Sequence, residues 1–252
     1  VYIWYAESSN AGAPGATDDT PDLTIKNPHA QADDPTAPGG SNAEELGGLL
    51  IPVGDLGSCT ADPGPGATCP EANLSTTRDG SPTVSHLPVL YSRAGDRVEL
   101  RGHWARPNPQ ARHAGAALAI VHGPHAYISP GWYPDKEAMA RVPTWNYAVA
   151  HLHGQLTTFD DAAALAGLVA ELSDRHEALV GGDWRFEPGR ADHLTQLRGI
   201  VGFRLLVEQV RMTFKFNQNH PPENRVAVAN HLEAQGTDRS RAVAALMRER
   251  SG

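Results

Sequence analysis

The sequence predicts an α+β fold in which helices surround a closed antiparallel β-barrel. Two observations support this prediction. Between residues 73 and 157, short runs of alternating apolar and polar residues are separated by hairpin turn signals such as Asp79-Gly80 and Gly95-Asp96. From residue 160 onward, apolar residues recur at helical spacing. Five or six antiparallel strands joined by short hairpins favour a barrel, because closure removes the exposed strand edges.

The composition limits the classes of function. The 252 residues suffice for one sizeable domain or two small ones, and 40% hydrophobic residues allow a buried core. The formal net charge of −8 argues against a protein that holds DNA on a basic face, since phosphate binding needs clustered Lys and Arg. No helix-turn-helix pattern appears either. Direct nucleic-acid binding is therefore not expected, and the one basic cluster is expected on a solvated helix face: Arg239, Arg241, Arg248 and Arg250.

The beginning of the chain is irregular. Residues 1–45 are rich in Gly, Pro, Asp, Asn and Ala, and we expect an irregular N-terminal arm that lies on the body or on a partner subunit, or is partly disordered. A short helix is predicted at residues 42–50 and a loop at residues 54–72. Cys59 and Cys69 lie in that loop, where a disulfide and two free thiols are the alternatives.

Neither a membrane span nor a secretory signal is apparent. No apolar run reaches the length of a span, and the first 20 residues lack a basic segment followed by an apolar one. We therefore expect a cytoplasmic protein that does not bind membranes.

The predicted elements follow a simple order. Strands are predicted at residues 74–77, 83–91, 98–103, 116–122 and 144–157, and β structure returns at residues 200–210 and 212–216. Helices are predicted at residues 160–179, capped by Asp160 or Asp161, and at residues 190–198, 221–236 and 237–250. The chain is thus divided into the arm at residues 1–45, a barrel domain at residues 46–220, and C-terminal helices at residues 221–252 that pack on the barrel.

The most unusual stretch is formed by residues 122–134 together with residues 142–147. These segments hold two His, two Trp, three Tyr and four Pro between two runs predicted as buried strands. Aromatic rings can form a wall for a flat ligand, and polar side chains can fix its edge. We therefore predict the rim of a cofactor site, with plain core as the alternative for the two tryptophans. The predicted wall consists of Tyr127, Ser129, Trp132, Thr144, Trp145 and Asn146.

Five motifs stand in the order of a known family. They are His86-Leu87-Pro88, Gly102-His103 with Asn108-Pro109, residues 122–130 with Trp132-Tyr133-Pro134, residues 143–147, and Phe214-Lys215 with Gln218-Asn219. Over about residues 74–234 the chain resembles the PaiB-like family, described as FMN-binding negative transcriptional regulators. The resemblance implies a split β-barrel of the pyridoxamine-phosphate-oxidase type, a homodimer, and a cofactor bound near the subunit interface.

The resemblance leaves two cofactors open, FMN and heme b. The same family contains haem-dependent enzymes similar to piperazate synthase, which close an N-hydroxylated diamino acid on itself through an N–N bond. Members usually begin with a short Tyr-x-Pro segment, whereas here the arm at residues 1–45 and the loop at residues 54–72 take its place. That departure, with the family's haem chemistry, leads us to favour haem and an enzyme by a small margin.

The resemblance also suggests individual site residues. His86 stands where a haem-binding relative would offer the axial ligand of the iron, and a histidine hydrogen-bonded inside the barrel is the alternative. Arg101 and Arg106 could grip an FMN phosphate or a haem propionate through paired hydrogen bonds, and ordinary salt bridges are the alternative. The candidates for a catalytic base are His103, His125 and Lys215, and the sequence does not choose among them.

Three functions follow from these candidates. In the first, iron held by His86 acts as a Lewis acid on a hydroxylamine-type small molecule, helping the N–O bond break while a second amine attacks the nitrogen. In the second, the protein is a flavoprotein that binds FMN in the same cleft. In the third, it regulates transcription through a small molecule or a partner protein.

Overall fold

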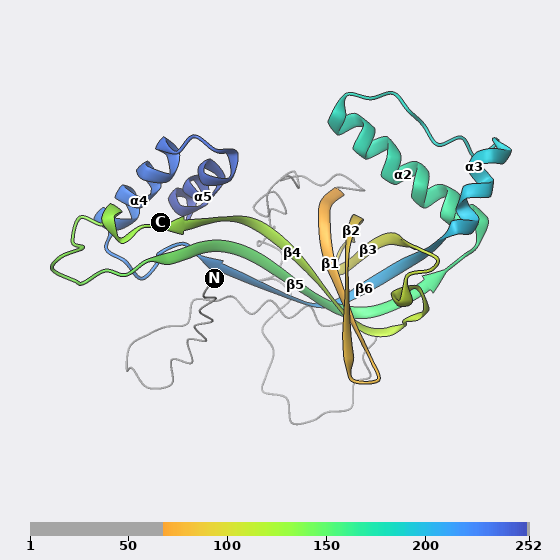
Figure 1. Ribbon diagram of the computed structural model, residues 1–252, viewed down its shortest axis with the longest axis horizontal. Helices are drawn as coiled ribbons and strands as arrows, with labels where there is room; N and C mark the ends of the chain where they lie inside the picture. Colours follow the sequence, from red (N-terminus) through yellow and green to blue (C-terminus); the bar gives the residue numbers. More distant parts are fainter. Residues whose placement is uncertain (1–67, 251–252) are drawn as a thin grey trace.

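The computed structural model describes residues 68–250 of the chain. Within this part, six antiparallel strands close into a barrel in the order β1-β2-β3-β6-β5-β4 (Figure 1). This architecture confirms the predicted α+β fold, a split barrel with peripheral helices. The strands are β1 (Thr68–Arg78), β2 (Ser81–Ala94), β3 (Arg97–Ala105), β4 (Gly115–Ile128), β5 (Thr144–Phe159) and β6 (Ile200–Lys215).

The helices lie outside the barrel. Asp161 caps α2 as predicted, since its side chain accepts a hydrogen bond from the backbone N–H of Ala164 at 2.8 Å. Gly181 ends the same helix with a φ of 71°, a left-handed conformation that favours glycine. No helix in residues 68–250 is long and apolar enough to cross a membrane. The helices are α2 (Ala162–Val180), α3 (Ala191–Gln196), α4 (Pro222–Ala234) and α5 (Asp238–Glu249).

Several predicted boundaries were wrong. β1 begins at Thr68, inside the stretch predicted as a loop, and β4 continues past His122 to Ile128. The register of β4 against β5 shifts between His122 and His125, and this irregularity accommodates Pro124, which has no N–H to donate to the ladder. β6 is unbroken, and the second predicted helix consists of α3 followed by a 3₁₀ turn. Three predictions fall outside the described residues. They are the N-terminal arm, the helix at residues 42–50, and the choice between a disulfide and two free thiols, since Cys59 is not described.

One hydrophobic core fills the barrel and continues beneath the C-terminal helices. Side chains alternate along the strands, so that Trp104 on β3 is buried whereas Glu99 and Arg101 on the same strand lie on the outer side. At the centre, the rings of Trp104 and Phe203 lie 4.5 Å apart between centroids. α4 and α5 contribute to the same core the side chains of Val228, Leu232, Val243, Ala244 and Met247.

Three of the strands are longer than the barrel. β1 pairs with β4 from Ala117 to Ile120, and β3 pairs with β6 from Ile200 to Val207. Beyond these pairings, β4, β5 and β6 continue together as a three-stranded extension (Figure 1). α4 and α5 lie on one side of the extension, while α2 and α3 lie at the other end of the molecule (Figure 1). The described helices therefore cover one face of the extension and leave the other uncovered.

A buried amide occupies part of the barrel interior. Gln110, in the 3₁₀ turn after β3, is 0% exposed. Its Nε2 group donates toward the carbonyl oxygens of Leu74 at 3.0 Å and Thr83 at 2.9 Å, and toward Thr76 Oγ1 at 2.9 Å. Its Oε1 accepts a hydrogen bond from Ser85. One side chain thus satisfies polar groups on both β1 and β2 where water has no access.

We expect Gln110→Leu to lower the free energy of unfolding by about 2–4 kcal/mol, because several buried polar groups lose a hydrogen-bond partner. Denaturant unfolding followed by circular dichroism measures this change. The matched control is Gln196→Leu at the exposed end of α3. An equally small loss of stability in both variants would contradict the role given to the buried amide.

Candidate cofactor site

The uncovered face of the extension gathers aromatic, imidazole and cationic side chains. Residues directly opposite each other in an antiparallel sheet point to the same side, and β5 places His125, Tyr147 and Lys215 in one row. The residues between them in sequence point the other way, and Asn146 and Ala148 are buried there. We call the uncovered side the open face. It carries His122, His125, Tyr127, Trp145, Tyr147, Val149, His151, Arg211, Thr213 and Lys215.

An aromatic cluster forms one end of the open face. The ring of His125 stacks on Trp145 with 5.4 Å between centroids, and Tyr127 lies 6.5 Å from the same indole. Tyr127 is 49% exposed and Trp145 is 46% exposed, so both rings are available to a ligand. Burial, followed by the nearby charges of Arg239 and His122, lowers the pKa of His125. His125 is therefore neutral at neutral pH and able to accept a proton.

Two cations of the open face are uncommitted. Arg211 and Lys215 make no hydrogen bond or ion pair with the described residues, and both side chains are exposed. They lie four residues apart on β6 and therefore point to the same side. Cations in this state can accept an anionic group of a ligand without first breaking a protein contact.

The two predicted phosphate-binding arginines have other partners. Arg101 donates to Glu171 of α2 at 2.8 Å and also lies 3.6 Å from Glu99. Arg106 donates to the carbonyl oxygens of Arg198 at 2.7 Å and Ile200 at 2.9 Å. Both guanidinium groups thus fasten elements together, which is the salt-bridge alternative named above, and their role at a cofactor stays a prediction.

His86 lies at the other end of the same surface. The strand register connects His86 on β2 with Asn73 on β1, Ile120 on β4, His151 on β5 and Arg211 on β6. His86 is exposed on the outside of the barrel, so it is not a histidine of the barrel interior. It shares a row with His151, whose pKa is lowered by burial and then by neighbouring positive groups.

The remaining predicted residues are dispersed. His103 lies on β3 opposite Gly202, outside the extension, with its Nδ1 atom buried and unbonded and its pKa lowered by burial. Asn146 is buried on the helix side, where its Nδ2 lies 3.4 Å from Met247 Sδ. Ser129 caps a 3₁₀ turn by accepting the backbone N–H of Gly131 at 3.2 Å. Trp132 stacks on His231 of α4, with 5.4 Å between centroids.

The structure thus brings together four of the predicted site residues on the open face, whereas His86 lies on the same side of the sheet but is separated from β5 by β1 and β4. The four are His125, Tyr127, Trp145 and Lys215, and Thr144 lies in the pocket described next. The sequence analysis missed Arg211, because it placed this residue between two predicted strands and so assigned it to neither face of the sheet. Unbroken alternation from Gln209 to Lys215 would have placed it on the open face, in the row of His151.

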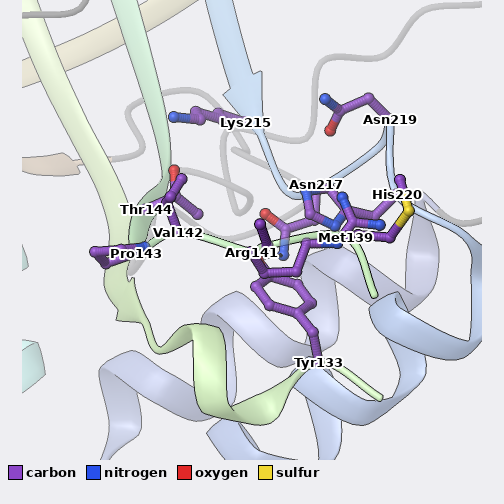
Figure 2. Close-up of a pocket in the computed structure, with 11 residues that line it drawn as sticks. Tyr133, Met139, Arg141, Val142, Pro143, Thr144, Lys215, Asn217, Asn219 and His220 are labelled. Carbon is purple, nitrogen blue, oxygen red and sulfur yellow. Dashed lines mark hydrogen bonds between the residues drawn. The ribbon is translucent and has the colours of Figure 1, made fainter. Parts of the chain in front are cut away.

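A pocket of about 340 Å³ opens at the ends of β5 and β6. It lies between the loop joining β4 to β5 and the loop joining β6 to α4 (Figure 2). We call it the strand-end pocket. Lys215 belongs to both the open face and this pocket, so the two are continuous. Its polar lining includes Tyr133, Arg141, Thr144, Lys215, Asn217 and His220.

Asp135 holds the first of these loops in place. Its carboxylate accepts hydrogen bonds from Arg141 Nε at 3.0 Å and Nη2 at 2.5 Å, and a third from Asn224 of α4 at 2.8 Å. These bonds lower the pKa of Asp135 to about 2. The same loop is fixed to the second one, since Asn217 donates to the Tyr133 hydroxyl at 2.9 Å. The pocket is therefore built from two loops that are tied to each other and to α4.

Comparison with known proteins gives one family. A family model described as "Putative FMN-binding domain" matches residues 67–209. The protease synthase and sporulation protein PAI 2 of Bacillus subtilis is 31% identical over 186 residues, which cover 69% of this chain and 84% of that protein. An uncharacterized protein of Emericella nidulans is 28% identical over 200 residues, covering 67% and 80%.

Solved structures match less closely. The FAD and Heme binding protein from Mycobacterium smegmatis is 18% identical, covers 75% of this chain and 78% of that chain, and gives a TM-score of 0.40. A match of this size carries no conclusion about the ligand of this chain.

We expect Asp135→Asn to flatten the acid limb of the stability profile. The folded-state pKa of Asp135, about 2, lies below the ordinary aspartate value of 3.8. Its stabilising contribution is therefore complete above the ordinary value and is lost as the pH falls from ~4 to ~2. Urea unfolding across that range should show a smaller slope in the variant. Asp96→Asn, on the β2–β3 turn, is the control, and an unchanged slope in Asp135→Asn would contradict the assignment.

Proposed function

Since the chain belongs to the PaiB-like family, whose model is described as "Putative FMN-binding domain", we propose that it binds FMN on the open face. Membership confirms the family resemblance found in the sequence. One observation supports the choice of this surface. Exposed aromatic rings lie on the same side of the extension as cations that have no hydrogen-bond or ion-pair partner among the described residues.

The open face offers FMN a flat aromatic contact. The exposed rings of Tyr127 and Trp145 would contact the isoalloxazine ring and exclude water from one of its faces. His125, neutral at pH 7, is the group of this face best placed to accept a proton. When bound, FMN supplies oxidation–reduction chemistry that side chains lack.

The barrel interior is a poor alternative for a flavin. Trp104, Phe203 and Gln110 fill it, and each is no more than 1% exposed. Small barrels are commonly filled by their own side chains in this way. A flat cofactor must then lie outside the barrel, and the acidic chain does not favour a nucleic acid on that surface.

We expect Trp145→Ala to weaken FMN binding roughly tenfold, because the flavin loses an aromatic contact surface. Flavin fluorescence titration of the purified chain measures this effect. Trp184→Ala is the matched control, since that indole is 48% exposed but lies in the loop after α2. Equal affinities of the Trp145 and Trp184 variants would remove the open face as the flavin site.

A haem enzyme is the second candidate, and the position of His86 favours it. His86 is exposed on the outer side of the sheet, in the row of His151, and there could offer an imidazole ligand to a haem. When bound, heme b would supply a Lewis acid for N–N bond formation on an N-hydroxylated diamino acid, as in piperazate synthase-like members of the family. The homodimer implied by the resemblance stays a prediction, which sedimentation of the purified chain would test.

The absorption spectrum of the protein as isolated separates the two candidates. We expect two broad flavin bands that persist in His86→Ala, because FMN does not require an axial imidazole ligand. A sharp Soret band that is lost or displaced in His86→Ala would instead establish haem and reject the FMN proposal. His113→Ala, in which a buried histidine bonded to Thr76 is removed, controls for general effects of losing an imidazole.

A further inference from the structure

We propose that the strand-end pocket, which adjoins the open face at Lys215, is a second binding site for a small organic anion, a carboxylate or a phosphate ester, with its charged group at Lys215. The proposal does not depend on which cofactor the open face binds. It follows from the charge, the unsatisfied polar groups and the shape of the pocket.

The charge of the pocket points to an anion. Among the described residues, two charged side chains line it: Arg141 and Lys215. The guanidinium of Arg141 is already neutralised by two hydrogen bonds from its Nε and Nη2 atoms to Asp135. Lys215 has no hydrogen bond or ion pair with any residue in the described part of the chain. The uncompensated charge of the lining is therefore positive, and a carboxylate or phosphate would give Lys215 its missing partner.

Neutral polar groups stand across from this charge. Figure 2 shows Lys215 and Thr144 on one side of the pocket and Asn219 and His220 on the other. The His220 ring stacks on Tyr133 with 4.8 Å between centroids, and its Nδ1 atom is buried without a hydrogen-bond partner in residues 68–250. No protein bond fixes its tautomer, so its other ring nitrogen, Nε2, can either donate to or accept from a ligand. Burial lowers the pKa of His220, which keeps it uncharged at neutral pH.

The remaining walls suit an organic molecule better than a bare ion. Met139 and Val142 also line the pocket, and they are 59% and 71% exposed. Apolar side chains this exposed gain from contact with a carbon skeleton. The volume of about 340 Å³ lies at the lower end of ligand pockets, which run from about 300 to 1,000 Å³. A short-chain acid or a small phosphate ester fits these dimensions.

The pocket is also formed before a ligand arrives. Asp135 ties the β4–β5 loop to Arg141 and to Asn224 of α4, and Tyr133 is bonded to Asn217 of the second loop. His220 is held in addition by the hydrogen bond from its backbone N–H to the carbonyl of Asn217 at 2.9 Å. A ligand therefore need not order these loops, which removes one of the main costs of binding.

The test is a calorimetric titration of the whole purified chain at constant ionic strength with succinate, with inorganic phosphate, and with neutral succinamide. We expect saturable binding of succinate and none of succinamide. Lys215→Met should weaken succinate binding about tenfold or more, the usual effect of losing a hydrogen bond to a charged group. His220→Phe, which keeps a ring against Tyr133 but removes its nitrogens, should weaken it several-fold. Phosphate binding that is also sensitive to Lys215→Met would extend the site to phosphate esters.

Arg211→Met is the matched control, because Arg211 is a second unpartnered cation on the same face of the same strand. It should leave succinate binding unchanged. Absence of saturable binding, or equal losses in the Lys215 and Arg211 variants, would overturn the proposal. Flavin content is read from the absorbance of each sample. A chain that does not bind added FMN in the fluorescence titration but still binds succinate through Lys215 would reject the FMN proposal and support this one.

Discussion

The excess length of β4, β5 and β6 is the constraint on which the rest of the structure depends. A six-stranded barrel needs about half of each of these strands, and the other half leaves the barrel as a sheet with two faces. A sheet buries one face to be stable, and α4 and α5 provide that cover through Val228, Leu232 and Val243. The second face is left with exposed rings, which is why the candidate site lies there and not within the filled barrel.

The cationic side chains discussed above fall into two groups: those paired within the protein and those available to a ligand. Arg101, Arg106 and Arg141 all bond to carboxylates or carbonyl oxygens, and each connects two segments distant in sequence or closes a loop. Arg211 and Lys215 have no such partner among the described residues and both lie at the sheet surface. The first group explains how helices and loops are held against the barrel. The second group explains where an anionic ligand can be bound without dismantling that framework.

Local patterns in the sequence were sufficient for the fold. Alternation along residues 98–103 and 144–157, together with the turns at Asp79-Gly80 and Gly95-Asp96, predicted strands that the structure contains. Pro124 misled the prediction for β4, since a proline ordinarily ends a central strand, and only the register shift beside it allows the strand to continue.

The site was harder to predict, because its geometry depends on pairing between distant segments. Two residues of the predicted wall, Tyr127 and Trp145, face outward, whereas Asn146 points beneath α5, because neighbouring residues on a strand alternate between faces. The network of Asp135 with Arg141 and Asn224 spans 89 residues of sequence and has no local signal. The unpaired state of Arg211 likewise becomes visible only when every possible carboxylate partner has been located in space.

The most direct test of this account is a crystal structure of the purified chain with FMN. The account predicts the isoalloxazine ring on the open face, against Tyr127 and Trp145. A flavin bound instead beside Arg101 and α2, or inside the barrel against Trp104, would contradict it.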